Sequence, residues 1–464
     1  MKPLLLSMVV VAASISCGET EDHAEWRVGC ARVSITPEEP VVLLGYGDRT
    51  QPFEHVAQDI HAKALAFEDG RGRRAVIVTA DLVGFQAAVV TESVSDRIRK
   101  ETGLERTQLL FNASHSHTGP LVSLDPWSEA NAIAHAPLSP DDRRKTIAYT
   151  RALQDRLVAV VRDAVSKLEP AQLAWGRGSV PFPMNRRLPR DGRIAMADNP
   201  QGRTDRSVPV LSAQTPAGGH IAFLFGCACH NTTLTGADNV ISGDYAGFAQ
   251  VYLEERFPGA QAMFMSGCGA DANPSPRGSM PLAERHGRTL GEEVARIAEG
   301  PLEEVRGDLG TAYETVELPL QDLPKSEIQE RAELPSAEAV TARQMLRVLE
   351  AGEPLPTEYP APLVAWHFGR AFTLIALPGE PVAEYVDLIE ATLPNQQLWI
   401  AGYSNDCFGY LPTEQVVGEG GHENIGVTLW LWGRDLRRHV GFFAPSVEQT
   451  IVGAAARMAR RQEP

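Results

Sequence analysis

Short apolar runs with the character of buried β-strands recur along the chain, and predicted helices lie between several of them. One run, Thr107–Phe111, leads directly into the polar segment Asn112–Pro120. Another, Ala75–Asp81, follows a turn at Asp69–Gly70 and is predicted to pair with Ile60–Phe67 as a hairpin. Because strands and helices alternate, the sequence predicts an α/β fold with mixed β-sheet layers and flanking helices. Active sites of such folds gather where strands end.

The other predicted elements continue this alternation. Further strands are predicted at residues 27–35, 208–211, 220–225, 261–265, 311–319, 372–377 and 398–401. Helices are predicted between Asp81 and Arg99, at 141–168, from Gly243 to about Phe257, at 337–350 and from about Ser446 onward. Residues 182–187 are predicted to be irregular, and residues 302–360 carry no recognisable chemistry.

The N-terminus has the features of an export signal. Lys2 precedes the apolar run Leu4–Ala13, which is too short to span a bilayer, and small residues follow. Residues 14–17 loosely resemble a bacterial lipoprotein cleavage site, in which Cys17 would be acylated and would attach the chain to a membrane. Ordinary cleavage is the alternative. We therefore predict a signal peptide over 1–17 and an exported protein, either secreted, periplasmic or an outer-surface lipoprotein.

Charge and cysteine content limit the partners and the crosslinks. The 464 residues include 59 acidic and 43 basic ones, giving a net charge of −16, and no stripe of Lys and Arg is evident. This balance argues against a nucleic-acid partner. Without Cys17, five cysteines remain, so at most two disulfides can form in an oxidising compartment, and their pairing cannot be read. The oligomeric state is also open.

The polar segment after Thr107–Phe111 contains His115 and His117. In an extended backbone, residues two apart project from the same face, so the two imidazoles would point together at the strand end. This geometry suits a metal ion, although a hydrogen-bonded polar rim is the alternative interpretation. The remaining ligands must come from other segments.

Other strand ends offer further candidates. His230 lies just past the strand 220–225, within a Cys-x-Cys-His run whose spacing does not match structural zinc sites. We interpret Cys227 and Cys229 mainly as small core residues. Glu380 follows a buried strand at a Pro-Gly turn, at the predicted start of a helix, and Tyr410 lies in the loop after residues 398–401. A capping role is the alternative for Glu380.

The order of these motifs resembles the catalytic domain of the neutral (alkaline, non-lysosomal) ceramidases. The resemblance covers most of the chain and rests on several motifs in one order: Gly45-Tyr46, 113–120, Asn185-Arg186, His230 with 241–247, 378–380, and 403–405 with Tyr410. It implies a ceramidase-like zinc hydrolase domain over 18–464. It also implies a substrate that is ceramide or a related lipid amide.

The resemblance also implies residue roles. One Zn²⁺ per chain would be bound by His115, His230, Glu380 and Tyr410, leaving a position for a water whose pKa falls toward ~7 and which attacks the amide carbonyl. His117 would act as the catalytic proton shuttle or oxyanion donor. The resemblance implies that Arg186 contacts the substrate.

Three departures from the family pattern are visible. Asn273 stands where the family has a serine, which excludes a serine acyl-enzyme at this position but leaves a zinc-water mechanism possible. His422 stands where the family has a second tyrosine of the site, and we assign both residues to substrate binding. The family's C-terminal β-sandwich domain is expected to be absent, because the sequence ends about where the catalytic domain should.

Two other functions stay open at this point. A metal-dependent phosphoesterase could assemble a two-metal site from Asp59, His61, Asp81 and the later histidines. A surface binding protein that retains zinc without turnover is the non-enzymatic alternative, supported by Asn273. A serine hydrolase is disfavoured, because no Gly-x-Ser-x-Gly motif occurs.

Overall fold

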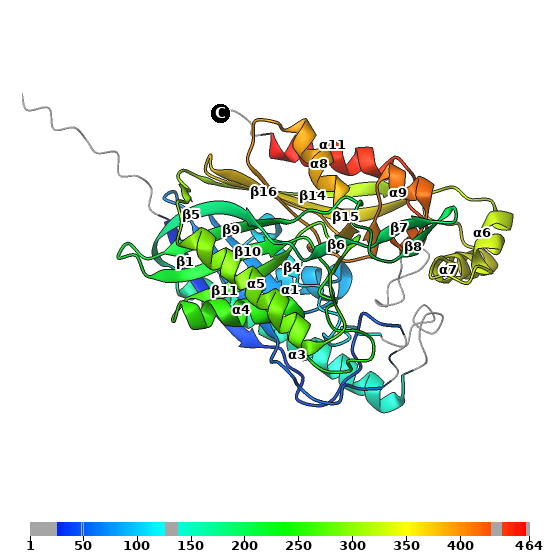
Figure 1. The fold of residues 1–464 in the computed structure, drawn as a ribbon, viewed down its shortest axis with the longest axis horizontal. Helices are drawn as coiled ribbons and strands as arrows, with labels where there is room; N and C mark the ends of the chain where they lie inside the picture. Colours follow the sequence, from blue (N-terminus) through cyan, green and yellow to red (C-terminus); the bar gives the residue numbers. More distant parts are fainter. Residues whose placement is uncertain (1–25, 48, 50, 126–137, 428–438, 461–464) are drawn as a thin grey trace, which may run out of the picture.

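Two β-sheets face each other at the centre of the molecule, and helices cover the outer face of each sheet (Figure 1). This computed structural model describes residues 26–460 except 48, 50, 126–137 and 428–438. The predicted signal peptide at 1–17, with Cys17, lies outside the described residues. The prediction of an α/β fold with mixed sheets and flanking helices is confirmed.

The larger sheet has the strand order β11-β10-β9-β5-β1-β2-β3-β4, with β13 paired to β5. Its strands are β1 (Trp26–Ser34), β2 (His61–Glu68), β3 (Arg74–Ala80), β4 (Leu109–Ala113), β5 (Glu169–Ser179), β9 (Ser207–Gln214), β10 (His220–Cys227), β11 (Gln261–Ser266) and β13 (Glu303–Glu304). The pairs β3–β4 and β10–β11 are parallel, and the other pairs are antiparallel. The predicted hairpin is present as β2 and β3, with Leu65 opposite Ile77.

The smaller sheet has the order β14-β15-β16-β18. Its strands are β14 (Leu309–Pro319), β15 (Glu358–Phe368), β16 (Phe372–Ala376) and β18 (Leu398–Ala401), and only β16 and β18 are parallel. Short two-stranded sheets join β6 (Pro183–Asn185) to β12 (Ala272–Pro274), β7 (Arg187–Arg190) to β8 (Arg193–Met196), and β17 (Glu380–Pro381) to β19 (Tyr410–Leu411). The segment 182–187, predicted to be irregular, therefore contributes to β6 and β7.

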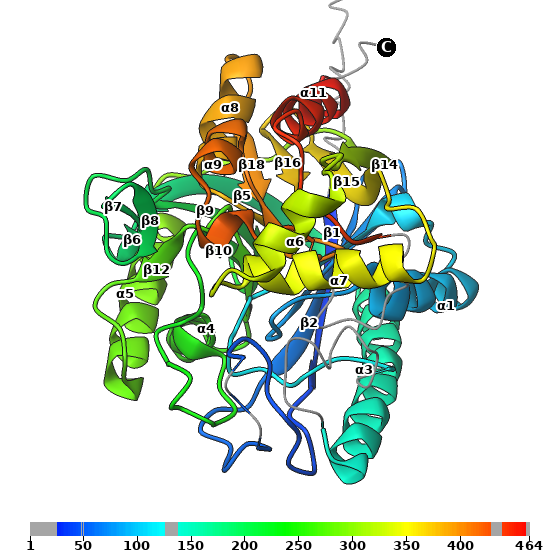
Figure 2. The same cartoon turned by 90° about the vertical axis from the view of Figure 1, so that its right-hand side faces the viewer.

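Most of the helices form two outer layers, whereas the helices over residues 325–350 lie at one end of the molecule, at the right of Figure 1 and in front in Figure 2. Those packed on the larger sheet are α1 (Glu92–Thr102), α3 (Pro140–Ser166), α4 (Asp244–Arg256) and α5 (Met280–Ala298). Those on the side of the smaller sheet are α6 (Lys325–Ala332), α7 (Glu338–Glu350), α8 (Glu384–Thr392), α9 (Glu414–Glu419) and α11 (Val447–Ala459). None of the helices in the described residues is both long and apolar enough to cross a bilayer.

A continuous apolar core fills the space between the two sheets. Leu110 of β4 and Met263 of β11 belong to the same buried cluster as Trp366 of β15 and Leu374 of β16. These strands are also covered by helices on their outer faces, so they are buried on both sides. This double burial explains why they appear in the sequence as unbroken apolar runs rather than alternating ones.

The ends of the parallel strands meet at one edge of the molecule. Isolated bridges connect Asn112 to Ser404, Gly267 to Ala401 and Ser116 to Asn231, which joins the segments after β4, β10, β11 and β18. Because β16 and β18 belong to the smaller sheet, this edge is where the two sheets contribute polar segments to one place. A site here depends on the packing between the sheets.

Replacement of a leucine in this core tests that dependence. We expect Leu110→Ala to lower the free energy of unfolding by about 2–5 kcal/mol, because it removes packed methyl groups from a side chain with 0% exposure. Leu334→Ala is the matched control, since Leu334 is 42% exposed and should change stability by about 0.5 kcal/mol or less. Urea unfolding followed by circular dichroism measures both. Equal effects of the two substitutions would contradict the described core.

Candidate metal centre

His115 begins the site, two residues after β4 ends. Its backbone has a φ of 61°, in the left-handed region, so the segment is not extended as the sequence analysis assumed. The prediction that His115 and His117 share one face of a strand is therefore wrong in its geometry. The two rings nevertheless meet, with 3.0 Å between their Nε2 atoms. The left-handed turn, rather than strand periodicity, brings them together.

His230 lies three residues after β10 and is fully buried. Its Nδ1 is 2.9 Å from the carbonyl oxygen of Gly269, and the Nδ1 of His115 is 2.6 Å from that of Val83. A carbonyl oxygen can only accept, so each Nδ1 carries the proton of its ring. Burial lowers the pKa of His230 to about 3, which keeps this imidazole neutral. His230 therefore presents a lone pair toward the site at Nε2, and the Nδ1 contact of His115 likewise leaves its Nε2 facing the site.

Glu380 faces both of these nitrogens. Its Oε2 lies 3.2 Å from Nε2 of His115 and 3.3 Å from Nε2 of His230. Neither Glu380 Oε2 nor His230 Nε2 has a hydrogen-bond partner among the described residues, although both atoms are buried. Lone pairs that face one another without a proton between them repel, and a divalent cation removes that repulsion. The donor set of two imidazoles and a carboxylate fits zinc.

His117 stands beside this donor set at the cavity wall. Its Nδ1 is buried without a hydrogen-bond partner among the described residues, and its ring packs edge-on against Tyr46 with 5.1 Å between centroids. Burial, and then the neighbouring histidines, hold the pKa of His117 well below its usual value. Gly45, with a φ of 108°, allows this approach, because a Cβ there would be 2.5 Å from the His117 ring.

Tyr410 reaches the site from the strand next to Glu380. The two residues are register partners in β17 and β19, so Glu380 belongs to a short strand, and the helix predicted to start there begins at Glu384. The hydroxyl of Tyr410 accepts a hydrogen bond from Nη2 of Arg186 at 2.9 Å. Burial raises the pKa of Tyr410, so without a cation the phenol stays protonated.

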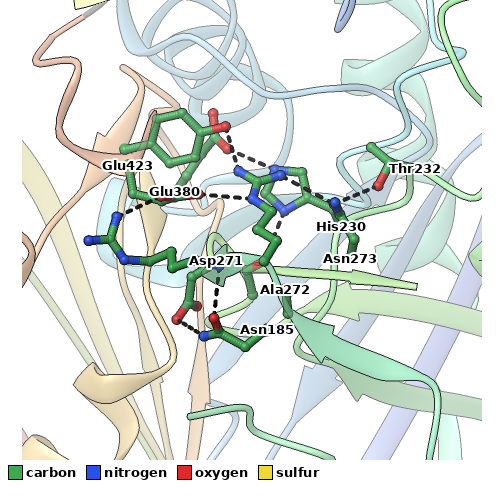
Figure 3. A network of polar contacts seen from close by, with 12 residues as sticks. Asn185, His230, Thr232, Asp271, Ala272, Asn273, Glu380 and Glu423 are labelled. Carbon is green, nitrogen blue, oxygen red and sulfur yellow. Dashed lines mark hydrogen bonds and ion pairs between the residues drawn. The ribbon is translucent and has the colours of Figure 1, made fainter. Parts of the chain in front are cut away.

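Arg186 connects several parts of the site, and Figure 3 labels two of its partners, Glu423 and Asn273. Besides Tyr410, its guanidinium donates to Oε1 of Glu423 at 2.9 Å and to the side-chain oxygen of Asn273 at 3.2 Å. Glu423 also accepts from Nη1 of Arg187 at 2.7 Å, so one buried carboxylate balances two buried arginines. The sequence analysis missed Glu423, because its partners are more than 200 residues away.

Asn273 and His422 lie on the same cavity wall as the site. The side-chain oxygen of Asn273 accepts from Arg186 and from the hydroxyl of Thr232 at 3.1 Å. Since a guanidinium only donates, this contact assigns the oxygen and turns the amide nitrogen away from Arg186. The His422 ring contacts Tyr410 with 5.1 Å between centroids, and burial lowers the pKa of His422 to about 4.

Two further residues of the centre were missed. Tyr403 has a φ of 49°, packs its ring 4.4 Å from that of His115, and has a buried hydroxyl with no hydrogen-bond partner among the described residues. Cys407 places its sulfur in a group with ligand atoms of His115 and Glu380, all within 4.8 Å of one another. Burial raises the pKa of the Cys407 thiol. A left-handed backbone has no clear sequence signature outside glycine, which explains the omission of Tyr403.

The other cysteines do not extend this centre. Cys227 and Cys229 are buried in the core, and neither belongs to a group of potential metal ligands among the described residues. All five cysteines that the structure describes are free thiols, so none of the disulfides left open by the sequence is present among them.

The residues considered for a phosphoesterase do not assemble into a metal site within the described part of the chain. Asp59 is exposed and accepts a hydrogen bond from Thr36 at 2.9 Å. Asp81 is buried and accepts from the backbone amide of His61 at 2.9 Å and from Gln250 at 3.3 Å. These carboxylates are used in structural hydrogen bonds.

A cavity of about 380 Å³ opens onto the centre. Its wall combines site residues with small and apolar ones: Gly45, Tyr46, Gly47, Val83, His115, His117, Arg186, Met196, Thr232, Asn273, Arg277, Ala337, Val340, Glu380, Cys407, Gly409, Tyr410, His422 and Ile425. All eight residues that the sequence analysis selected, except His230, are on this wall, and His230 lies directly behind it against Glu380. The arrangement can bind a cation beside a partly apolar ligand.

Comparison with known proteins assigns the family. The family described as neutral/alkaline non-lysosomal ceramidase, N-terminal, matches residues 26–273, which is more than half of the chain. The chain belongs to this family. The resemblance found in the sequence is thereby confirmed, and the matched ceramidase region contains His115, His117, Arg186, His230 and Asn273. Glu380, Tyr410 and His422 lie beyond the matched region.

Two curated ceramidases are similar in sequence. The chain is 26% identical to neutral ceramidase of Pseudomonas aeruginosa over 260 residues, and 23% identical to neutral ceramidase A of Dictyostelium discoideum over 276 residues. These alignments cover 54% and 55% of this chain but only 36% and 37% of the relatives' own length.

Solved ceramidase structures share the fold. The crystal structure of neutral ceramidase from Pseudomonas aeruginosa matches with a TM-score of 0.72 and 20% identity, covering 94% of this chain and 74% of that one. A structure described as ceramidase complexed with C2 matches with the same TM-score and 18% identity, covering 94% of this chain and 75% of that one. The structural match thus reaches well beyond residue 273.

The buried carboxylate between the two arginines is open to a direct test. We expect Glu423→Ala to lower the free energy of unfolding by about 3 kcal/mol or more, because it leaves two buried guanidinium groups without their shared partner. Glu419→Ala is the matched control. Glu419 also pairs with Arg187, but its side chain is 37% exposed, so its loss should cost about 1 kcal/mol or less. Urea unfolding of metal-free protein measures both, and a reversed order would contradict the network.

Proposed function

We propose that this protein is a zinc-dependent amidohydrolase that cleaves an N-acyl amide bond in ceramide or a related lipid amide. The observation that carries the proposal is the buried Glu380 carboxylate facing the Nε2 atoms of two buried histidines on the wall of a partly apolar cavity. Membership of the ceramidase family supports the same chemistry.

His115, His230 and Glu380 would hold one zinc ion per chain, with the oxygen of Tyr410 as the fourth ligand. The buried lone pairs of the first three residues fit this ion, and Tyr410 is the register partner of Glu380. When bound, zinc supplies a Lewis acid that polarises a carbonyl and lowers the pKa of water toward ~7. The hydrogen bonds of both Nδ1 atoms to carbonyl oxygens orient the two imidazoles for this purpose.

His117 would transfer a proton during the hydrolysis, from the centre to the departing amine. Its Nε2 lies 3.0 Å from the Nε2 of His115, so a neutral His117 can take a proton beside the centre and return it to the departing amine. Tyr46 and Gly45 hold the ring in place. A basic nitrogen at this point serves hydrolysis by water and needs no side-chain nucleophile.

Asn273 would support the substrate carbonyl. Because its oxygen accepts from Arg186 and Thr232, its amide nitrogen is the group left to donate, and such a donor can stabilise a developing oxyanion. Arg186 would position Asn273 and Tyr410 together. His422, beside Tyr410, would contact the substrate from the cavity wall.

The cellular setting belongs to the same proposal. An exported protein with a signal over 1–17 would meet its substrate outside the cytoplasm. A lipid anchor on Cys17 would hold a domain over 18–464 close to membrane amides. The strongly acidic composition supports a partner other than nucleic acid.

Metal content tests the proposed centre. We expect about one zinc per chain in the purified protein by plasma mass spectrometry. Glu380→Gln and His230→Asn should each weaken zinc binding by about 100-fold or more, since loss of a ligand exceeds the effect of an outer contact. His61→Asn is the matched control, because His61 lies on β2 away from the centre, and it should retain the metal. Full zinc binding by both site variants would refute this ligand set.

Hydrolysis tests the role of His117. We expect wild-type protein to release fatty acid from a fluorogenic N-acyl sphingosine, and chelation to abolish the release. His117→Gln should keep its zinc but lower kcat by about 10²–10⁴-fold, the usual contribution of a positioned acid or base. Loss of zinc in this variant would make His117 a ligand instead. Cleavage of a phosphoester but of no amide would favour a phosphoesterase, and zinc without any turnover would favour a binding protein.

A further inference from the structure

Arg277 lines the cavity, and the protein supplies hydrogen-bond partners for only some of its N–H groups. It follows β12 and lines the cavity with Tyr46. Its Nη2 donates to the Tyr46 hydroxyl at 2.8 Å, and its Nε is buried without a hydrogen-bond partner among the described residues. The Tyr46 hydroxyl also donates to the Leu234 carbonyl at 2.7 Å, and burial raises the pKa of Tyr46 to about 12. Tyr46 is therefore a neutral partner.

The two arginines on the cavity wall have different surroundings. Arg186 forms an ion pair with Glu423 at 2.9 Å, whereas Arg277 forms no ion pair with any described carboxylate within 4.0 Å. The carboxylate of Asp244 acts on Arg277 from a longer distance. Its oxygens already accept hydrogen bonds from the amides of Leu234 and Tyr245. Among the described residues, Arg277 thus lines the cavity without a carboxylate in direct contact, and Asp244 offsets its charge only from a longer distance.

A series of contacts leads from Arg277 to the centre. Arg277 touches Tyr46, whose ring packs on His117, which meets His115 at the centre. On the other side of the centre, Tyr410 contacts His422.

The apolar wall begins three residues beyond His422. Ile425 lies there, and its carbonyl accepts from Thr341 of α7 at 2.7 Å. Val340, also of α7, and Ala337 line the same cavity, as does Met196 of β8, whose side chain is 52% exposed. The cavity therefore combines a guanidinium group with apolar residues around the centre.

We propose that the amine half of the substrate carries a carboxylate that binds Arg277, so that the preferred substrates are N-acyl amino acids. This inference rests on the proposed amide hydrolysis and narrows its substrate class. Water adds to the amide carbonyl, the C–N bond breaks, the acyl chain leaves as a carboxylate, and the amino acid leaves with the extra proton. The acyl chain lies along Val340 and Ile425, and the carboxylate pairs with the guanidinium.

The net charge of the whole protein acts against an anionic ligand. At a net charge of −16, the surface repels anions, so an anionic substrate needs a local cation to enter the cavity. A ceramide would instead place the neutral hydroxyl groups and second chain of its amine half against Arg277, leaving the guanidinium without a counter-charge. A carboxylate supplies two acceptors in the fork geometry that arginine prefers.

A matched pair of substrates tests the proposal: N-lauroylglycine, and N-lauroylglycinamide, in which an amide replaces the carboxylate. We expect the wild-type zinc protein to favour the acid by about 10- to 100-fold in kcat/KM, the usual value of a charge-assisted hydrogen bond. Arg277→Gln should bring this ratio close to one, and Arg277→Lys should restore part of it. Arg285→Gln removes the same charge from an exposed site eight residues away and should keep the ratio.

Calorimetric binding of both compounds to chelator-treated protein separates the two proposals. Amide cleavage with a ratio that Arg277→Gln leaves unchanged overturns the inference and keeps the proposed function. Absence of cleavage with Arg277-dependent binding of the acid refutes the proposed function and supports the ligand class. Absence of both amide cleavage and Arg277-dependent binding overturns the inference and the proposed function. Zinc content and melting temperature of each variant establish that the site has folded.

Discussion

The structure depends on one unfavourable arrangement, a buried carboxylate that faces two buried imidazole nitrogens. His115, His230 and Glu380 follow β4, β10 and β16, and these strands belong to two different sheets. Left-handed backbone at His115 and Tyr403 adds about 1–3 kcal/mol of strain each. The apolar core between the sheets offsets these costs, and it fixes the three segments so that they cannot relax apart.

Two buried arginines beside this centre form ion pairs with glutamates. Glu423 neutralises Arg186 and Arg187 in the interior, which lets Arg186 hold Tyr410 and Asn273 without attracting Glu380 away from the histidines. Removing either partner of such a buried pair costs far more than the pair itself contributes. The network therefore specifies geometry, and among the described residues none of its arginines forms an ion pair with Glu380.

The sequence predicted what depends on local pattern. Buried strands such as β4, β10 and β11 were recognised from their apolar runs, and the family motifs brought His115, His230 and Glu380 into one hypothesis before any coordinates. Helix α5 and strands β5 and β15 were missed, and the convergence of His115 with His117 was given the wrong geometry. Glu423 was not predicted because distant ion pairs leave no periodic signal, and Tyr403, although part of the 403–405 motif, received no role because its left-handed turn leaves none either.

Asn273 shows how a departure from a family pattern can be accommodated. Its oxygen is held by Arg186 and Thr232, so the residue is integrated into the same network that orients Tyr410. A serine would place its oxygen one bond closer to the backbone than the Asn273 oxygen that both donors contact. An amide at this position can donate a hydrogen bond but cannot act as a nucleophile. Arg277 lies four residues further along the same segment, so residues 273–277 bring both an amide and a guanidinium group to the cavity wall.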